Sequence, residues 1–544
     1  MPQTPEDRLD SWKEIAAYLQ RGVRTVRRWE KEEGLPVHRQ VHQVLGSVYG
    51  YKSEIEAWRQ RRARRPSERH VPPSTTTAAV KSIVVLPFTN LSTDPENGYF
   101  ADGLTDEVTA GLSHVRSLRV TSRTSSMTFK ETTKDVRAIA AALGVRYVVE
   151  GSVRRAENRL RVTAQLIDAG ADEHLWSDKY DGTIDDVFAI QERIARTIVD
   201  ALELRLSADE DRRLAHRPIG DVRAYDCYLR ARQEGWRWRE DAIGHAIQLL
   251  HEALAIAGEN ADLYAALGRA YLQYREAGID FGERPLGEAE HCARKVFALE
   301  PQSAAGLQLR GWIRYSRGDI QDAVLDLKRA LAIEPNNADT LLLLTNCCLI
   351  SGRMAAARPL IERLLAVDPL TPVSRCMPAW ADVLEGRVES AVAPYRLMFE
   401  MDPGNPMARL FYVWILVINR RHEAAGAIAD ACPAEARGTV AVRIASFLVD
   451  AAAGKPADAL TLTPDIEAVA TATDVFPRFL AQGFAIAGMA DRALDWLTVA
   501  VDRGFINYPY LAANDPALES IRSHPRFAQL MDRVRVSWER FRDS

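Results

Sequence analysis

The sequence has little cysteine, no long apolar run and no recognisable leader. Its 6 cysteines in 544 residues are irregularly spaced in the second half and none forms C-x-x-C, which argues against a disulfide framework and favours buried, reduced thiols. The longest apolar run is Leu410–Ile418, about half of what a membrane-spanning helix needs. The first residues lack the apolar core of a signal peptide. We therefore expect a cytoplasmic protein without membrane contact.

Catalytic signatures are also missing. The chain contains neither G-x-x-x-x-G-K-[ST] nor G-x-S-x-G, and Gly454-Lys-Pro lacks the upstream glycine of a phosphate-binding loop. His38 and His42 are spaced i, i+4, but no cysteine or carboxylate set accompanies them as further metal ligands. We expect no enzyme, no cofactor and no metal.

Length and charge indicate a divided chain. A sequence of 544 residues is too long for one hydrophobic core, and 47% hydrophobic with 26% charged residues is an ordinary composition for several soluble domains. The net charge of −4 conceals an uneven distribution, because residues 20–65 hold 12 basic and 5 acidic side chains. A basic segment on an acidic body predicts contact with a polyanion at one end only.

A repeat organises the second half, from about residue 220 to the end. Pro301, Pro335, Pro369 and Pro403 are each 34 residues apart, an alanine lies twelve residues before each of them, and Gly318, Gly352 and Gly386 separate the two halves of the units. This period and pattern resemble the tetratricopeptide repeat, which predicts helical hairpins stacked into a superhelix. The clearest copy is 304–337, and less regular copies fit 227–260, 261–303, 406–437 and 474–507.

The basic segment reads as helix, turn, helix, hairpin and helix. Ile15, Ala16 and Leu19 form one apolar face, Gly22 permits a turn, and Val23, Val26 and Trp29 form the inner face of a second helix. A β-hairpin is predicted over His38–Tyr51, and a last helix from Ser53 carries Ile55 and Trp58 inward. The motifs that follow this order are Trp12-Lys-Glu-Ile-Ala, Arg24-Thr-Val-Arg-Arg-Trp-Glu, Gly34-Leu-Pro and Tyr49-Gly-Tyr-Lys.

This segment resembles the winged DNA-binding domains of the MerR and excisionase type over roughly residues 11–60. The resemblance implies that the second helix enters the major groove and that the hairpin contacts the backbone or minor groove. The implied DNA contacts are Arg24, Thr25, Arg27, Arg28, Lys31 and Arg39. The five arginines within 59–65 either extend the phosphate contact or form a solvated run. The same basic helix face is also compatible with simple solvation or with protein docking.

Residues 82–206 alternate strand and helix patterns after a linker at 66–81. A long amphipathic helix is predicted over 184–206, and alternation with polar residues predicts a half-buried antiparallel strand that carries Leu160, Val162, Ala164 and Leu166. The residues Val84-Val-Leu-Pro-Phe-Thr-Asn-Leu-Ser, Tyr99-Phe-Ala-Asp-Gly-Leu-Thr-Asp-Glu-Val and Tyr147-Val-Val-Glu-Gly-Ser-Val resemble the TolB amino-terminal and FlgO-like α/β domain. That resemblance implies a binding or assembly module and supplies no catalytic residues. Asp102, Asp106 and Glu107 are placed at a predicted helix N-terminus, where we expect them to cap free N–H groups rather than to bind metal or catalyse.

The predicted inner surface of the repeats carries mixed side chains that do not specify a ligand: Arg310, Arg314, Asn346, Arg375 and Asp382. Its arginines are compatible with binding of an acidic peptide and also with simple solvation in the groove. We expect Trp312, Trp380, Trp414 and Trp496 to be core residues, and the tail from Leu511 to Phe527 to cover the last apolar face.

These patterns predict a multidomain chain with a small winged helix-turn-helix at 1–65, a linker at 66–81, an α/β middle domain at 82–206 and an all-α tetratricopeptide superhelix with a C-terminal cap at 220–544. The leading hypothesis is a DNA-binding regulator that contacts DNA through residues 11–65 and an unknown protein or peptide through the repeat groove, with a homodimer as one possible state. The alternatives are a scaffold whose N-terminal domain docks protein rather than DNA, and an enzyme with its site in 82–206.

Overall fold

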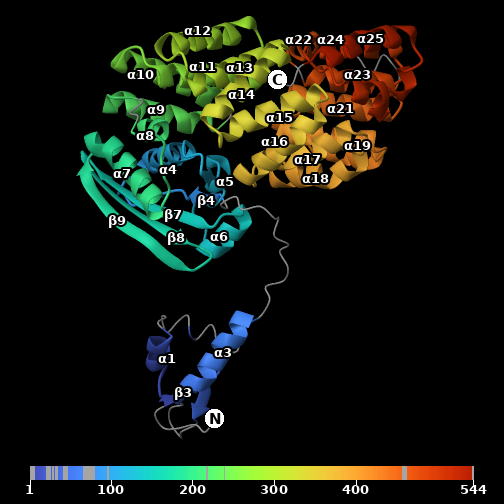
Figure 1. Cartoon of the computed structure of the whole chain (residues 1–544). Coiled ribbons are helices and arrows are strands. Elements are labelled where there is room, and N and C mark those ends of the chain that lie inside the picture. The colour runs from blue at the N-terminus through green and yellow to red at the C-terminus, as the bar shows by residue number, and fades with distance from the viewer. Residues whose placement is uncertain are drawn as a thin grey trace. The chain divides into compact units, whose positions relative to one another are not determined.

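The computed structural model describes residues 7–19, 26, 30, 35–40, 47–64, 80–94, 97–215, 219–237, 239–277, 279–455, 462–473 and 475–541. The chain divides into two compact units, Met1–Ala79 and Val80–Ser544 (Figure 1). Among the described residues, none of the helices combines the length and apolar character that crossing a membrane requires.

The first unit is a small sheet with two described helices. Its elements are β1 (Arg8–Leu9), α1 (Trp12–Tyr18), β2 (His38–Gln40), β3 (Ser47–Tyr51) and α3 (Lys52–Arg64). The strands are antiparallel in the order β1-β3-β2, and His38 pairs with Tyr49, which confirms the predicted hairpin. The predicted core residues Ile15, Ala16, Leu19, Ile55 and Trp58 are buried together.

The predicted second helix of this unit falls mostly outside the described residues. Of its expected inner face only Val26 is described, and its side chain is fully buried. The winged helix-turn-helix arrangement therefore stays a prediction.

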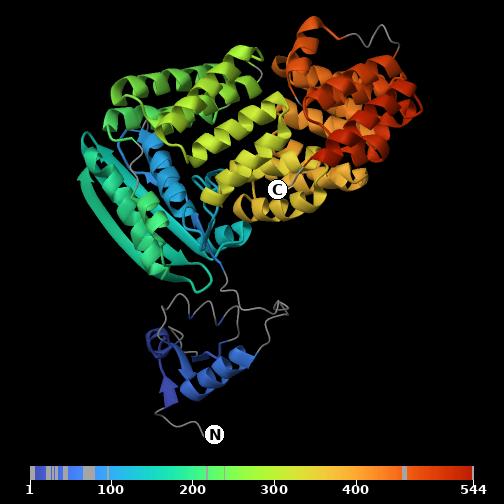
Figure 2. The same ribbon diagram turned by 45° about the horizontal axis from the view of Figure 1, so that its top comes forward.

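The second unit begins with a mixed sheet between helices (Figures 1 and 2). Its elements are β4 (Lys81–Val85), β5 (Thr89–Asn90), α4 (Gly98–Ser113), β6 (Leu118–Val120), α5 (Arg123–Met127), α6 (Val136–Leu143), β7 (Tyr147–Ala156), β8 (Arg159–Asp168), β9 (Glu173–Thr183), α7 (Val187–Ala201) and α8 (Ala208–Leu214). The strand order is β6-β4-β7-β8-β9, with β5 beside β7. β4 runs parallel to β6 and β7, whereas β7, β8 and β9 are antiparallel.

Alternation along the strands determines which face of this sheet is covered. Leu160, Val162, Ala164 and Leu166 of β8 face the core formed with α4 and α7, as their period of two predicts. The other face is covered by α6 near β4 and β7, where Val148 packs with the α6 side chains. Of the residues of β8 that alternate with the buried set, Arg159 and Arg161 are exposed, and Thr163 and Gln165 are half-buried.

Two helices differ from their predicted bounds. α4 begins at Gly98 rather than at Asp102, because Tyr99 and Phe100 already bury their side chains in the sheet core from the first turn. The long helix predicted over 184–206 ends at Ala201, shortly before Glu203 takes a left-handed backbone conformation with φ of 50°. The short helix α8 was not predicted, although Ser207 and Glu210 form a capping box at its start.

The remainder of the unit is helical. The first helices of successive hairpins are α9 (Val222–Gly235), α11 (Ala261–Glu276), α13 (Ala304–Arg317), α15 (Ala338–Ile350), α17 (Pro372–Leu384), α19 (Pro406–Ile418), α21 (Val440–Ala452) and α23 (Phe476–Ile486). The second helices are α10 (Glu240–Ala257), α12 (Glu283–Leu299), α14 (Ile320–Ile333), α16 (Met354–Val367), α18 (Val392–Met401), α20 (His422–Asp430), α22 (Pro464–Ala472) and α24 (Ala490–Asp502), and α25 (Pro525–Arg540) follows them.

The helical hairpins turn where the sequence pattern requires. Gly318 ends α13 with φ of 87°, a left-handed conformation that glycine adopts without a steric cost. Pro335 follows the end of α14, and Ala323 at the crossing of the two helices is fully buried. The predicted repeat of helical hairpins over 304–337 is therefore confirmed.

One hydrophobic core joins the sheet to the first hairpins. Side chains of α4 and α7 pack in the same buried cluster as those of α9 to α13, and the cluster ends at Leu309 and Ile313. Gly103 of α4 lies so close to Leu229 of α9 that an added Cβ would approach that side chain to 2.6 Å. The sheet and the first repeats thus form one continuous body.

Candidate functional site

Of the predicted DNA contacts, Arg39 is among the described residues. Arg24, Thr25, Arg27, Arg28 and Lys31 lie outside the described residues. Arg39 is on β2, with 62% of its side chain exposed, and its guanidinium forms an ion pair with Glu30 at 2.6 Å. The exposed part of this arginine remains accessible to a ligand.

A ring cluster that the sequence analysis did not single out lies on the hairpin next to Arg39. The rings of His38 and Tyr49 stack with centroids 5.2 Å apart, Tyr51 meets Tyr49 edge-on, and the Arg8 guanidinium lies 4.1 Å above the Tyr49 ring. His38 Nε2 also lies 2.6 Å from a Glu54 carboxylate oxygen. The alternation of Tyr49 and Tyr51 about Gly50 was the signal that could have predicted it.

His42, the other member of the predicted histidine pair, lies outside the described residues. Within the part of the chain that the structure describes, no group of three or more His, Cys, Asp or Glu side chains is arranged to hold a metal ion.

The acidic residues of α4 do not cap the helix, so that prediction is wrong. Because α4 starts at Gly98, Asp102 and Asp106 lie in its interior, and both side chains are buried. Each carboxylate instead meets a basic side chain of the chain itself. Lys130 binds Asp102 at 2.8 Å, Arg123 binds Asp106, and Arg232 of α9 lies 3.2 Å from Asp106 and 3.3 Å from Glu107.

This buried charge cluster joins the α/β layer, the part of the second unit from β4 to α8, to the first repeat helix α9. Burial raises the pKa of the Glu107 carboxyl to about 7, the positive charge of Arg232 opposes that rise, and the neighbouring Asp106 carboxylate adds to it. Burial also raises the pKa of Asp106 against the attraction of Arg232 and Arg123. The carboxylates are engaged in holding α4 to α9.

We predict that the protein becomes less stable as the pH rises from about 4.5 to about 7, through Glu107. The folded state binds a proton at Glu107 across this range whereas the unfolded chain has lost it, so the contribution to the free energy of unfolding falls by up to about 3 kcal/mol. Glu107→Gln should flatten this part of the profile of melting temperature against pH. Glu288→Gln, an exposed control, should leave the profile unchanged, and parallel profiles for wild type and Glu107→Gln would contradict the prediction.

A second set of contacts binds the α/β layer to the ends of later repeat helices. Asp368, at the end of α16, accepts hydrogen bonds from the hydroxyl groups of Ser122 and Ser125, and the Ser122 N–H donates to the Val367 carbonyl at 2.7 Å. At the end of α14, Asn336 donates to the Leu118 carbonyl at 2.9 Å. The α/β layer therefore contacts the repeats at three places along the array.

The predicted groove residues are largely bonded within the array. Arg310 and Arg314 both bind the fully buried Asp326, at 2.6 and 2.5 Å. Asp382 pairs with Arg358 and Arg387. Asn346 donates to the Tyr315 hydroxyl at 2.8 Å, and Arg375 is exposed. Arg310 and Arg314 are therefore not free to grip an acidic peptide.

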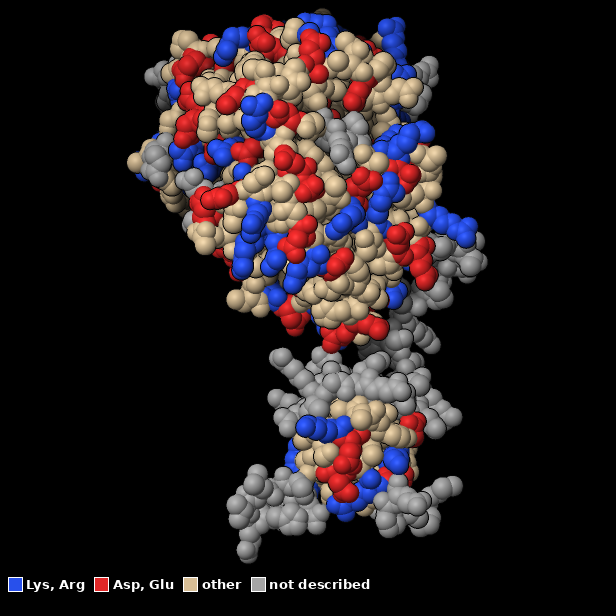
Figure 3. Space-filling model, turned by 90° about the vertical axis from the view of Figure 1, so that its left-hand side faces the viewer, with Lys and Arg blue, Asp and Glu red and all other residues tan. Residues whose placement is uncertain are grey.

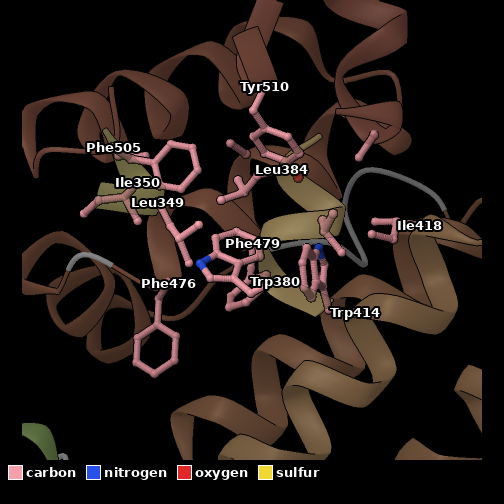
Figure 4. Close-up of a cluster of buried hydrophobic side chains, with 14 of the residues drawn as sticks. Leu349, Ile350, Trp380, Leu384, Trp414, Ile418, Phe476, Phe479, Phe505 and Tyr510 are labelled. Carbon is pink, nitrogen blue, oxygen red and sulfur yellow. The ribbon is translucent and has the colours of Figure 1, made fainter. Parts of the chain in front are cut away.

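An aromatic cluster fills the space between the middle repeats and the C-terminal segment, by which we mean the residues after α24, from 503 to 541 (Figure 4). Trp380 of α17 lies 5.8 Å from Trp414 of α19 and 6.3 Å from Tyr510, measured between ring centroids. Phe479 of α23 meets Trp414 edge-on at 5.4 Å, and Phe505 packs beside Trp380. As predicted, Trp380, Trp414 and Trp496 are core residues, whereas Trp312 is only partly buried.

Polar groups beneath this aromatic cluster are also internal. The Trp414 indole N–H donates to Gln482 at 2.8 Å, and Gln482 donates to Asp515 at 2.7 Å. The buried Arg478 guanidinium lies 4.6 Å from the Trp414 ring centroid and 4.8 Å from that of Trp380. Burial raises the pKa of the Asp515 carboxyl, and the hydrogen bond from Gln482 opposes the rise.

The tail covers the last hairpin, as predicted, and reaches the middle repeats as well. Ser520 donates to the Ala485 carbonyl of α23 at 2.7 Å. The Ile506 N–H donates to the Ile350 carbonyl at 3.0 Å, and the Asn507 and Asn514 amides donate to the Leu349 and Leu384 carbonyls. The C-terminal segment therefore caps the ends of α15 and α17 and packs Tyr510 against Trp380 of α17.

The first helices α11, α13 and α15 keep an accessible face, crossed by polar contacts. Arg269 of α11 binds Gln308 at 3.0 Å and Asp339 at 3.4 Å, and the Trp312 indole N–H donates to Glu276 at 2.6 Å. Leu342 and Asn346 of α15 are partly exposed on the same helices. We call this set, Arg269, Trp312, Asp339, Leu342 and Asn346, the first-helix strip.

Comparison of the sequence with known proteins finds one family model and one protein that are similar to parts of this chain. Residues 314–374 match the family model described as tetratricopeptide repeat, which confirms the predicted repeat type. A protein of Rhizobium meliloti (strain 1021) named "Putative adenylate cyclase 3" is 41% identical over 259 residues, which cover 46% of this chain and 44% of that protein. The chain thus spans less than half the length of this relative.

Solved structures are similar at lower identity. A thermophilic tetratricopeptide-repeat protein of Thermus thermophilus is 21% identical, with 36% of this chain and 98% of that chain covered and a TM-score of 0.30. A tetratricopeptide repeat protein of Parabacteroides merdae is 13% identical, with 51% and 99% covered and a TM-score of 0.32. TolB of Acinetobacter baumannii is 19% identical, with 23% and 28% covered and a TM-score of 0.18. The resemblance of residues 82–206 to TolB-type domains stays a prediction.

Proposed function

We propose that this tetratricopeptide-repeat protein is an interaction scaffold that binds a protein partner along its first-helix strip. Arrays of such repeats bind partners through the surface that their first helices line. In this chain the C-terminal segment packs on Trp380 and caps the end of α17, whereas α11, α13 and α15 keep partly exposed side chains on their first-helix surface. The cross-helix contacts of Arg269 and Trp312 hold the strip in place before a partner arrives, which lowers the entropic cost of binding.

The chemistry of the strip favours a partner segment with an apolar anchor and flanking charge. Trp312 and Leu342 supply partly exposed apolar area, and tryptophan is enriched among residues that dominate interface energies. Arg269 and Asp339 already bind one another, with 38% and 55% of their side chains exposed. The exposed parts of these two side chains suit polar contacts at the rim of an interface rather than a buried ion pair with the partner.

The test compares quantitative co-purification by the intact chain and two variants. Trp312→Ala should lose at least about tenfold in recovery of the specific partner, in line with the cost of removing a dominant interface residue. The control Arg329→Ala changes a residue of the second helix α14, outside the strip, and should recover the partner as wild type does. Equal recovery by all three proteins would contradict the proposal.

The proposal includes no catalysis. The relative named for adenylate cyclase aligns with less than half of this chain, and the buried carboxylates of α4 are engaged with Lys130, Arg123 and Arg232. We expect no conversion of ATP to cyclic AMP by the purified chain with Mg²⁺ or Mn²⁺. Turnover that Asp102→Asn abolishes without loss of stability would establish an enzyme instead.

A second proposal concerns the first unit, which we infer binds DNA through residues 11–65. The observation that favours it is the β2–β3 hairpin, which carries the largely exposed Arg39 beside stacked His38 and Tyr49. The proposed contacts are Arg24, Thr25, Arg27, Arg28, Lys31 and Arg39. Such a scaffold would work in the cytoplasm, where DNA and protein partners are both accessible to it.

Gel-shift titrations of the full chain in rising salt test this second proposal. Binding should weaken steeply with salt as phosphate contacts are lost, and Arg24→Ala combined with Arg28→Ala should abolish it. Trp312→Ala should bind DNA as wild type does, which keeps the two proposals separable. Absence of salt-sensitive binding to every genomic fragment would contradict the DNA proposal and favour the alternative, in which the first unit docks protein.

A further inference from the structure

The strand β9 leaves one edge of the sheet open. It is eleven residues long, ends the strand order and pairs with β8 alone among the described strands. Along such an edge the backbone N–H and C=O groups point outward without a strand to bind, which makes the edge a template for another strand. Ser177, Asp178, Lys179 and Asp181 are exposed along it.

The part of β9 that is regular begins at Trp176. Leu166 of β8 pairs with Trp176 and Ile167 pairs with His174, so Leu175 is an extra residue in a bulge. From Trp176 to Thr183 the side chains alternate without interruption. Tyr180 is buried against the sheet core with the Arg193 guanidinium 4.5 Å above its ring, while Ser177, Lys179 and Asp181 point to the uncovered face.

We propose that two copies of the chain associate through this edge, by antiparallel pairing of β9 with β9 about a two-fold axis at Tyr180. A two-fold axis perpendicular to the sheet keeps the covered faces of both copies on the same side of the joined sheet. Residues that face each other across the two strands must point to the same side, and this holds only when one residue at the axis faces its own counterpart. The regular segment therefore allows few registers, and charge distinguishes them.

Among the registers centred within residues 178–181, the one centred on Tyr180 is the register that places no charged side chain opposite its own copy. Registers centred on Asp178, Lys179 or Asp181 place that charged side chain directly opposite its own copy, which is destabilising. With Tyr180 at the centre, Lys179 faces the partner's Asp181 and Asp181 faces the partner's Lys179. Ser177 then faces the partner's Thr183, a pair of hydroxyl groups that can bond across strands.

The neighbouring strand extends this complementarity. Arg161 of β8 pairs with Asp181 at 2.5 Å on the same face. Across the joined edge the charges would then follow the order Arg161, Asp181 and the partner's Lys179, which alternate in sign. Among the described residues of the second unit on the side shown in Figure 3, basic and acidic side chains are interspersed, so these residues form no large patch of one sign that would oppose the approach of a second copy.

Sedimentation equilibrium of the full chain, whose monomer mass is 60.7 kDa, tests the pairing. Wild type should form dimers in a concentration-dependent manner. Lys179→Asp and Asp181→Lys should each weaken the dimer by about tenfold or more, because both symmetric pairs become repulsive. Arg159→Asp, the same charge reversal on the neighbouring strand β8, should leave association unchanged.

Mixing the two single variants provides the sharpest outcome. In the mixture, Asp at 179 and Asp181 of the Lys179→Asp variant face Lys at 181 and Lys179 of the Asp181→Lys variant. Both pairs are complementary, so the mixture should form a heterodimer with near wild-type affinity, although each variant alone associates about tenfold or more weakly. A wild type that stays monomeric at every concentration would overturn the proposal. So would a dimer that both variants leave intact, or a mixture that fails to associate.

Discussion

Asp368→Ala is expected to loosen the α/β layer from the repeat array and to lower the free energy of unfolding by roughly 3 kcal/mol or more. The Asp368 carboxylate is 4% exposed and accepts hydrogen bonds from Ser122 and Ser125 of the α/β layer. It also accepts from the hydroxyl groups of Thr371 and Ser374 at 2.7 and 2.6 Å. Alanine would leave buried hydroxyl groups without their acceptor, and such groups carry the full cost of their lost hydration.

The repeat itself supplies a matched control for this variant. The residue before the regularly spaced proline is acidic in four successive units, namely Glu300, Glu334, Asp368 and Asp402. Asp402 occupies the same position one unit later but is exposed. Thermal unfolding and limited proteolysis should show a lower melting temperature and faster cleavage between the layers for Asp368→Ala only. An equal effect of Asp402→Ala would contradict the claim that the contacts of Asp368 hold the α/β layer to the repeats.

Trp414→Ala should destabilise the C-terminal half by about 3–5 kcal/mol, the usual cost of removing a large buried aromatic side chain. The indole is 1% exposed, contacts Trp380, Tyr395 and Phe479, and donates its N–H to Gln482. Its loss would open a cavity among α17, α18, α19 and α23, next to Gln482, which also binds Tyr510 and Asp515 of the C-terminal segment. It would also leave one Gln482 acceptor unsatisfied in that cavity.

Hydrogen exchange and denaturant titration together measure this effect. The amides of Ile506 and Tyr510, which donate to Ile350 and Asn507, should exchange much faster in Trp414→Ala, and the unfolding midpoint followed by circular dichroism should fall. Trp236→Ala removes a tryptophan that is 37% exposed and should change stability by less than about 1 kcal/mol. Unchanged exchange at Ile506 would show that the aromatic cluster does not hold the segment.

Local patterns predicted the elements of this fold well. The 34-residue spacing of the prolines predicted the helical hairpins, and alternation predicted β8 and the hairpin of the first unit, because helix and strand periods are properties of neighbouring residues. The acidic residues of α4 were misplaced for the same reason. Asp102 followed by glycine resembles a helix start, and only the burial of Tyr99 and Phe100 in the sheet core places that start earlier.

Long-range contacts could not be read from the sequence. The repeat pattern places Arg310 and Arg314 in the groove, but it does not show that both bind Asp326 on the following helix. The return of the C-terminal segment to α15 and α17 joins Asn507 to Leu349 across 158 residues, and no local spacing encodes such a contact. The open edge of β9 likewise depends on its position in the strand order rather than on its own sequence.

The most direct test of the scaffold is site-specific photo-crosslinking along the first helices of the intact chain. A benzophenone amino acid at Leu342 lies in the first-helix strip, and the same group at Arg329 lies on the second helix α14. The proposal predicts that Leu342 captures a defined protein and that Trp312→Ala removes this product, while Arg329 captures none of it. Capture of the same proteins from both positions, or from neither, would contradict the scaffold.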